Sequence, residues 1–328
     1  MIIARAPFRV SFCGGGSDIP SFYEKYGGCV LSTTIRKYVY LTIHKSFLKD
    51  EITLKYSKTE VVKDPDQIEH RIFRQVLKDF GTKGVEITSM ADIPAGTGLG
   101  SSSAFTVALL KLLYTYNEKF ASTYKIAKEA CDVEINQLGN PIGKQDQFAS
   151  AFGGLRYYEF RPDGFVKTEP IVMRSSSFRK LEDSIMMFYT GALHDANQIL
   201  KEQSKALASQ NEKINATIKL CEMTRELKKS FEENDIDVLG PTLARSWEIK
   251  KSLASGISNP LIDGCYERGM KAGASGGKLL GAGGGGFLLF YVPEPEKKEA
   301  VREALHDLIE LPVELDNSGA SIIFTNSF

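Results

Sequence analysis

Residues 94–103, PAGTGLGSSS, decide how the rest of this chain is interpreted. Glycines alternate with other residues, three serines follow, and apolar residues then recur at helical spacing through the predicted helix at 101–117. Glycine is used where the backbone needs a positive φ or must approach another group closely. A helix start offers unpaired N–H groups and the positive end of the helix dipole, which suit an anion. We therefore predict that residues 94–103 form a phosphate-binding loop, named the phosphate loop. Because serine also caps helices, a glycine turn with a serine cap and no ligand is the alternative.

Two further glycine clusters, residues 13–18 (CGGGSD) and 281–286 (GAGGGG), narrow the class of nucleotide site. A Walker loop requires Ser or Thr after Gly-Lys, but Gly277-Lys278 is followed by Leu279 and Gly143-Lys144 by Gln145. Residues 281–286 contain a formal GxGxxG pattern. It precedes the predicted strand at 287–292, whereas a dinucleotide-binding loop follows its strand and opens a helix. The order therefore argues against a nucleotide-dependent oxidoreductase.

Composition excludes several other classes of protein. The 328 residues are 42% hydrophobic and 25% charged, which is typical of a folded protein of about two domains and not of a disordered one. Lys plus Arg and Asp plus Glu both number 41, so no net field attracts nucleic acid or a membrane. The five cysteines form no CxxC pair and the four histidines no HxxxH pair, which indicates free thiols and gives no case for zinc. The first residues do not resemble a secretory signal, and no apolar run is long enough to span a membrane. We expect a cytoplasmic protein.

The pattern of predicted elements indicates two α+β domains, residues 1–180 and 181–328. In the first, strands are expected at 2–12, 30–44 and 85–90, and helices at 66–80, 101–117 and 124–138. From 195 to 254 the pattern is helical. The remainder predicts a helix at 260–272, a glycine-rich loop at 273–286, strands at 287–292 and 311–315 around a helix at 295–309, and an apolar run at 322–324.

In this order, the three glycine clusters resemble the GHMP small-molecule kinases, the superfamily of galactokinase, homoserine kinase, mevalonate kinase and phosphomevalonate kinase. The segments 5–18, 26–28 and 31–35 resemble more narrowly the bacterial D-glycero-D-manno-heptose 7-phosphate kinases of this superfamily. The resemblance implies an N-terminal ribosomal-protein-S5-like α/β domain and a C-terminal ferredoxin-like α+β domain. It also implies ATP and Mg²⁺, a small sugar substrate, and phosphorylation of the anomeric hydroxyl on the way to GDP-heptose for surface glycans. Galactokinases have Gly-Glu-His-Thr-Asp where this chain has residues 14–18, GGGSD, which argues against galactose.

The same resemblance assigns roles to individual residues. Asp146, twelve positions after Glu134, falls on the catalytic aspartate, and Arg9, nine positions before Asp18, falls on the arginine beside it. Mg²⁺ would be held by Ser102 and Glu134. ATP would be bound by Pro94, Gly96, Gly98, Leu99, Gly100, Ser101, Ser102, Ser103 and Gly284, and the sugar by Gly16, Ser17, Asp18, Gly143 and Lys144.

Several alternatives remain open from the sequence. Asp146 is assigned as the general base toward the C1 hydroxyl, but it could instead orient that hydroxyl or cap the next helix. The cluster at 283–286 is expected to pack on the phosphate loop more than to contact phosphate. A phosphate on the sugar needs a basic partner, and Arg36, Lys37, Lys144 and Arg156 are all near the motifs. A fucose-like sugar, or a non-catalytic sugar and ATP sensor on the same scaffold, are the rival functions. The sequence does not indicate an oligomeric state.

Overall fold

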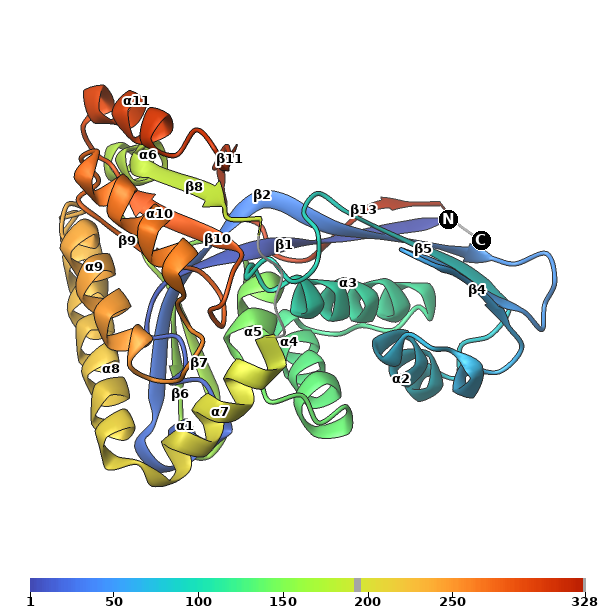
Figure 1. Ribbon diagram of the computed structural model, residues 1–328. Coiled ribbons are helices and arrows are strands. Elements are labelled where there is room, and N and C mark those ends of the chain that lie inside the picture. Colours follow the sequence, from blue (N-terminus) through green and yellow to red (C-terminus); the bar gives the residue numbers. More distant parts are fainter. Residues whose placement is uncertain (192–195, 327–328) are drawn as a thin grey trace.

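A computed structural model describes residues 1–191 and 196–326 of the chain, and in this part the strands form two sheets (Figure 1). The first sheet contains β1 (Ile2–Cys13), β2 (Gly28–Lys45), β3 (Ile52–Lys55), β4 (Thr59–Val62), β5 (Val85–Ala91), β6 (Arg156–Phe160), β7 (Val166–Pro170), β12 (Leu315–Asp316) and β13 (Ser321–Thr325). Its main path runs β13-β1-β2-β5-β3-β4, and β6 and β12 also pair with the long β2. The second sheet has the order β11-β8-β10-β9, with β8 (Ile185–Tyr189), β9 (Gly276–Leu279), β10 (Phe287–Tyr291) and β11 (Ile309–Leu311).

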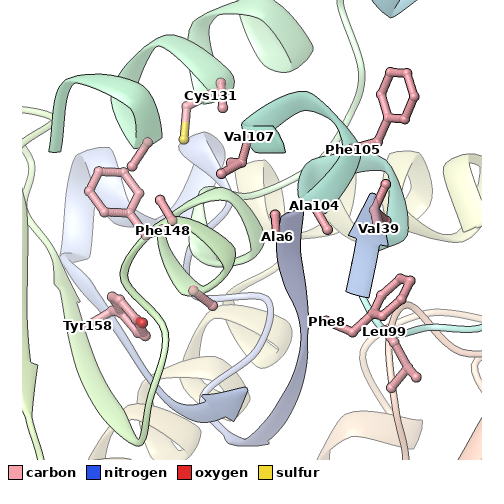
Figure 2. Packing of buried hydrophobic residues seen from close by; sticks show 14 of the residues in the cluster. Ala6, Phe8, Val39, Leu99, Ala104, Phe105, Val107, Cys131, Phe148 and Tyr158 are labelled. Carbon is pink, nitrogen blue, oxygen red and sulfur yellow. The ribbon is translucent and has the colours of Figure 1, made fainter. Parts of the chain in front are cut away.

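Helices cover one face of the first sheet (Figure 1). They are α2 (Arg71–Phe80), α3 (Ser101–Tyr116), α4 (Thr123–Cys131) and α5 (Gln145–Phe152). The central helix α3 packs on β1 and β2, and Figure 2 shows Ala104 and Val107 of α3 near Ala6 of β1. These side chains are fully buried, and the small alanines let the helix approach the sheet closely. The hydrophobic core thus fixes the start of α3 against the middle of β1, where the N–H of Arg9 donates to the carbonyl oxygen of Leu99.

The helix predicted at 101–117 is confirmed as α3. Gly100 precedes it with a φ of 77°, and Gly96 and Gly98 also have positive φ. A side chain at these three positions would strain the backbone, so the glycines shape the loop before α3.

The predicted helical segment at 195–254 is three helices in the described residues, and position 195 itself lies outside them. The three are α7 (Ala196–Ser209), α8 (Asn211–Glu232) and α9 (Leu239–Lys251). The other helices are α1 (Pro20–Tyr26), α6 (Ser175–Ser184), α10 (Pro260–Lys271), α11 (Pro295–Ala304) and a 3₁₀ turn, η1 (Pro65–Gln67). Helix α9 packs against β9 so closely that a Cβ atom at Gly276 would overlap the carbonyl oxygen of Gly240.

Other predicted elements are corrected by the structure. The helix expected at 124–138 is α4 followed by a π-helical turn, η2 (Asp132–Gln137). The helix expected from 66 starts at Arg71, because Asp64 caps the separate turn η1 and Ile68 is extended. The glycine-rich loop expected at 273–286 contains β9, whose pairing with β10 was hidden by its two glycines.

The end of the chain returns to the first sheet. Strand β13 pairs with β1, and β12 pairs with β2. The mixed α+β architecture is confirmed. The division between residues 180 and 181 stays a prediction. Under that division, β12 and β13 belong to the second domain by sequence, although they pair with strands of the first sheet. Within the described residues, no helix is long and apolar enough to cross a membrane.

Candidate active site

Most of the predicted site residues lie around one cleft of about 320 Å³. The first sheet and the turn after β1 contribute Arg9, Ser11, Gly15, Gly16, Asp18 and Ile19. The phosphate loop contributes Gly96, Gly98, Gly100, Ser101, Ser102 and Ser103. Glu134, Gly143, Gln145 and Asp146 line it from η2 and the start of α5, and Lys250, Lys278, Gly281 and Ala282 line it from the second half of the chain. Segments more than 100 residues apart in sequence therefore converge here.

Arg9 and Asp146 form a two-pronged ion pair. Nε of Arg9 donates to Oδ1 of Asp146 at 2.7 Å, and Nη2 donates to Oδ2 at 2.8 Å. Nη1 of Arg9 also donates to the carbonyl oxygen of Gly98 at 2.6 Å. A planar guanidinium suits this bidentate geometry, so Arg9 fixes the carboxylate against the phosphate loop.

Asp146 reaches this position because it lies in the first turn of α5. The backbone of the phosphate loop comes so near that a Cβ atom at Gly100 would lie 3.1 Å from Oδ2 of Asp146. Glycine at this point therefore permits the carboxylate of Asp146 to border the loop.

Ser102 and Glu134 are also in direct contact. The Ser102 hydroxyl donates to Oε1 of Glu134 at 2.6 Å, and Nε2 of Gln147 donates to Oε2 at 2.7 Å. Glu134 is fully buried, and burial raises the pKa of its carboxyl group. It lies in the π-helical turn η2, a kind of turn that is frequent at functional sites because it redirects side chains.

This pair of oxygens fits the chemistry of Mg²⁺. Mg²⁺ takes hard oxygen ligands and usually few of them from the protein, the rest being phosphate oxygens and water. Within the described residues no group of three or more His, Cys, Asp or Glu could hold a metal. One buried carboxylate beside one hydroxyl at the start of α3 is therefore suited to an ion that arrives with the phosphates, and a cation would offset the buried charge of Glu134.

Asp18 is the centre of a second network. Its carboxylate accepts hydrogen bonds from the backbone N–H of Gly16 at 3.0 Å and from the backbone N–H and Nε2 of Gln145 at 3.1 and 3.0 Å. A Cβ atom at Gly143 would overlap this carboxylate, so glycine is required there. Burial raises the pKa of Asp18, and the nearby charge of Asp146 raises it further.

Two polar atoms beside Asp18 were not found by sequence reasoning. Oγ of Ser11 and Oε1 of Gln145 are buried without a hydrogen-bond partner among the described residues, and both side chains line the cleft. Buried polar atoms are rarely left unpaired, so these are suited to ligand hydroxyl groups. Ser11 alternates along β1 with buried apolar residues, and no sequence motif distinguished it.

Five residues predicted to bind ligands do not line the cleft, and Ser17 and Lys144 are two of them. The Ser17 hydroxyl is fully buried and donates to backbone carbonyls, among them that of Gly14 at 2.8 Å. The Lys144 ammonium donates to the Gly164 carbonyl oxygen at 3.1 Å and lies 4.4 Å from the centre of the Tyr23 ring. Lys144 does not line the cleft, so this geometry does not favour its assignment to the sugar, which stays a prediction.

The third of these residues, Gly284, donates its N–H to the Ile257 carbonyl oxygen at 2.9 Å. Pro94 and Leu99 of the phosphate loop are likewise absent from the cleft lining; Leu99 is fully buried and its carbonyl accepts the Arg9 N–H. Their contribution is to the shape of the loop.

The other bases considered for a substrate phosphate are also outside the cleft lining. Arg36 pairs with Glu314 on the surface, and Nε of Arg156 donates to the Gly153 carbonyl oxygen. Lys37 does not line the cleft either.

The third glycine cluster packs on the phosphate loop. A Cβ atom at Gly281 would overlap the Cα atom of Gly98, and one at Gly286 would overlap the carbonyl oxygen of Thr97. The two loops are therefore in backbone contact, and the second half of the chain closes one side of the cleft.

A glycine-rich loop at a helix start with a carboxylate beside it is the arrangement expected of a small-molecule kinase, and sequence comparison gives the family. The sequence model of the GHMP kinases N terminal domain matches residues 68–154, and that of the GHMP kinases C terminal domain matches residues 227–310. The chain belongs to the GHMP kinases, as its motifs predicted.

Individual relatives are sugar kinases. The D-glycero-alpha-D-manno-heptose 7-phosphate kinase of Campylobacter jejuni is 29% identical over 316 residues, 93% of each chain. The crystal structure of a D-glycero-D-manno-heptose 1-phosphate kinase from Bacteroides thetaiotaomicron has a TM-score of 0.81 and 27% identity, with both chains covered completely. A bifunctional fucokinase/GDP-fucose pyrophosphorylase of Arabidopsis thaliana is 26% identical over 95% of this chain and 32% of that protein. The chain is a sugar kinase that uses ATP as its phosphoryl donor.

Proposed function

We propose that this enzyme transfers the γ-phosphoryl group of ATP to the anomeric hydroxyl of D-glycero-D-manno-heptose 7-phosphate and releases the 1,7-bisphosphate, a precursor of GDP-heptose for surface glycans. The observation that carries the proposal is the Arg9–Asp146 pair, which lies between the phosphate loop and the Asp18 network. The names of the two heptose kinase relatives both describe an acceptor that already bears a phosphate, at C7 in one and C1 in the other.

On the donor side, the backbone N–H groups at the start of α3 and the helix dipole bind the phosphates of ATP. Ser102 and Glu134 hold Mg²⁺, which neutralises charge on the phosphates when it is bound.

On the acceptor side, Asp18 accepts hydrogen bonds from sugar hydroxyls, and Ser11 and Gln145 supply the further polar atoms that lack partners. Asp146 accepts the proton of the C1 hydroxyl, which is more acidic than an ordinary alcohol because it belongs to a hemiacetal. Arg9 orients Asp146 and offsets negative charge on the transferred phosphoryl group.

A fucose-like acceptor is the second candidate. It is supported by the fucokinase relative, whose match extends over 95% of this chain. A cytoplasmic location is part of the proposal, because ATP is available there and all five cysteines are free and buried.

The test is ADP release from Mg-ATP with a panel of acceptors: heptose 7-phosphate, heptose 1-phosphate, mannose, fucose and galactose. We expect kcat/KM to be highest for heptose 7-phosphate by at least about a hundredfold, the discrimination that polar contacts in a closed site provide. Preferred turnover of fucose would replace the acceptor, and preferred turnover of heptose 1-phosphate would move the reacting hydroxyl away from C1.

A further inference from the structure

Two buried lysines line the cleft and have no role in the reaction as described so far. Lys250 lies in the last turn of α9 and is 8% exposed, and Lys278 lies on β9 and is 5% exposed. Lysine is almost never buried unless its charge is paired. Two such residues facing one cleft therefore require an explanation.

The packing of α9 on β9 brings the two side chains together. The backbones meet at Gly240 and Gly276, where any side chain on β9 would overlap the helix. Side chains two apart on a strand share a face, so Lys278 lies on the same face of β9 as Gly276, toward α9. Lys250 approaches from the C-terminal end of that helix.

In the part of the chain that the structure describes, neither ammonium group has a carboxylate partner. Nζ of Lys250 donates to the carbonyl oxygens of Gly281 and, at 3.5 Å, Leu279, and Nζ of Lys278 donates to the carbonyl oxygen of Phe12 at 3.1 Å. Among residues 1–191 and 196–326, no Asp or Glu lies within ion-pair distance of either. Each ammonium has three donors, so unused donors remain.

The pKa values of the two lysines are consistent with their burial without acidic partners among the described residues. Burial lowers the pKa of both lysines, to about 8 for Lys278, and the charge of Arg9 lowers each of them further. Buried like charges without an acidic partner are costly until an anion arrives.

The lysines line the same cleft as Ser11, Gly16 and Asp18. Nζ of Lys278 donates to the carbonyl oxygen of Phe12, directly before the turn that ends in Asp18. Lys278 therefore borders the sugar-binding network. Lys250 lies beside Gly281, on the side of the cleft that the second half of the chain closes, and the carboxylate of Asp18 raises its pKa.

We propose that Lys250 and Lys278 form an anion subsite that binds the phosphate already carried by the acceptor sugar. The inference rests on the proposed function, because it requires a phosphorylated acceptor. A terminal phosphate offers three oxygens, enough to accept from both ammonium groups. The pair then selects phosphorylated sugars, since an unphosphorylated sugar leaves two buried cations unpaired.

The experiment compares Lys250→Met, Lys278→Met and the double variant with wild type, using heptose 7-phosphate and the unphosphorylated heptose as acceptors. Methionine keeps an unbranched apolar side chain and removes the charge. We expect each single variant to raise KM for heptose 7-phosphate by about tenfold or more, with KM for ATP and kcat/KM for the unphosphorylated heptose unchanged.

The matched control is Lys251→Met, at the next position of α9. Its ammonium pairs with Glu248 at 2.9 Å and lies over the Trp247 ring, and the residue does not line the cleft. Both KM values should stay at the wild-type level. An equal fall of kcat for both acceptors in the Lys250 and Lys278 variants would mean that the lysines act on the transferred phosphoryl group, and would overturn the proposal.

A measurement on the wild-type enzyme covers the case in which the variants do not fold. Inorganic phosphate should inhibit competitively against heptose 7-phosphate and not against Mg-ATP, and competition with Mg-ATP alone would overturn the subsite. The two proposals can fail separately. If wild type prefers heptose 7-phosphate and the lysine variants keep that preference, only the subsite is wrong; if wild type prefers an unphosphorylated sugar, the proposed acceptor is wrong and the subsite fails with it.

Discussion

Replacement of Asp146 by asparagine separates the chemical role of this residue from its structural one. The amide has the shape of the carboxylate but cannot accept the proton of the acceptor hydroxyl. We expect kcat to fall by about a hundredfold or more, the usual contribution of a general base, while the Kd for ATP stays nearly unchanged.

The effect on stability follows from the ion pair. Asp146 accepts two hydrogen bonds from Arg9, at 2.7 and 2.8 Å, and the side chains are 23% and 5% exposed. Removing one partner of a buried ion pair costs about 3–5 kcal/mol. Because asparagine keeps one acceptor and Asp146 is partly exposed, we expect the free energy of unfolding to fall by about 2–3 kcal/mol.

Steady-state ADP release, calorimetric titration with ATP and urea unfolding measure the three quantities. The control is Asp307→Asn, which removes a similar pair with Arg268, 2.9 Å apart but on the surface. It should change stability by at most about 1 kcal/mol and leave kcat unchanged. If Asp146→Asn retains turnover within a few fold of wild type, Asp146 is not the base, and its role is to orient the hydroxyl.

Other predictions concern the metal, the loops and the substrate phosphate. Glu134→Gln should raise the Mg²⁺ concentration for half-maximal activity by about tenfold or more, because an amide is a weaker ligand for Mg²⁺ than a carboxylate. Stability should not fall, because burial already disfavours the charged carboxylate. An unchanged Mg²⁺ titration would show that Glu134 is not a metal ligand. Gly281→Ala should lower Tm and raise KM for ATP, because the position has a φ of 75° and a Cβ atom there would overlap the phosphate loop. The control Gly264→Ala, in α10 with open space around it, should stabilise the protein by about 0.5–1 kcal/mol. Equal Tm shifts in the two variants would contradict the loop contact. As pH rises through about 8, Lys278 should lose its proton, because its pKa is lowered to about 8 by burial. We then expect kcat/KM for heptose 7-phosphate to fall by up to about tenfold per pH unit, without this fall for the unphosphorylated heptose. Parallel pH profiles would show that the Lys278 charge does not bind the substrate phosphate. Lys144→Ala should leave the ratio of the two kcat/KM values unchanged, because its ammonium is bound outside the cleft, and a selective loss with the phosphorylated sugar would reinstate it.

Features with a local cause were predictable from the sequence. The glycine-rich loop before α3 and α3 itself were predictable because their causes, glycines that take positive φ at 96, 98 and 100 and an apolar helical pattern, lie in adjacent residues. The spacing between Glu134 and Asp146 was informative because a family resemblance gave it meaning.

Features that depend on contacts between residues far apart in the sequence were not predictable from it. Lys250 and Lys278 resemble any surface lysines in the sequence, and only the contact of α9 with β9 buries them. Strand β9 was interpreted as a loop because it begins with two glycines, of which Gly276 serves the contact with α9 and Gly277 packs against Phe290 of β10. The π-helical turn that directs Glu134 to Ser102 has no distinct residue pattern and was taken as a continued helix.

The sequence motifs also assigned two neighbouring side chains, those of Ser17 and Lys144, to a cleft that they do not line. Ser17 and Lys144 lie next to residues that do line the cleft, yet their side chains are directed elsewhere. A motif predicts where the backbone passes, whereas the direction of each side chain depends on partners such as Cys29 and Gly164 that are distant in sequence.

The central claim is that the cleft directs the γ-phosphoryl group to the anomeric oxygen of a heptose that already carries a phosphate. Phosphorus NMR of the product formed from Mg-ATP and heptose 7-phosphate tests it most directly. We expect one new phosphorus resonance coupled to the anomeric proton, beside the retained resonance of the C7 phosphate. A new resonance coupled to any other sugar proton, or no new sugar phosphate while fucose is converted, would contradict it.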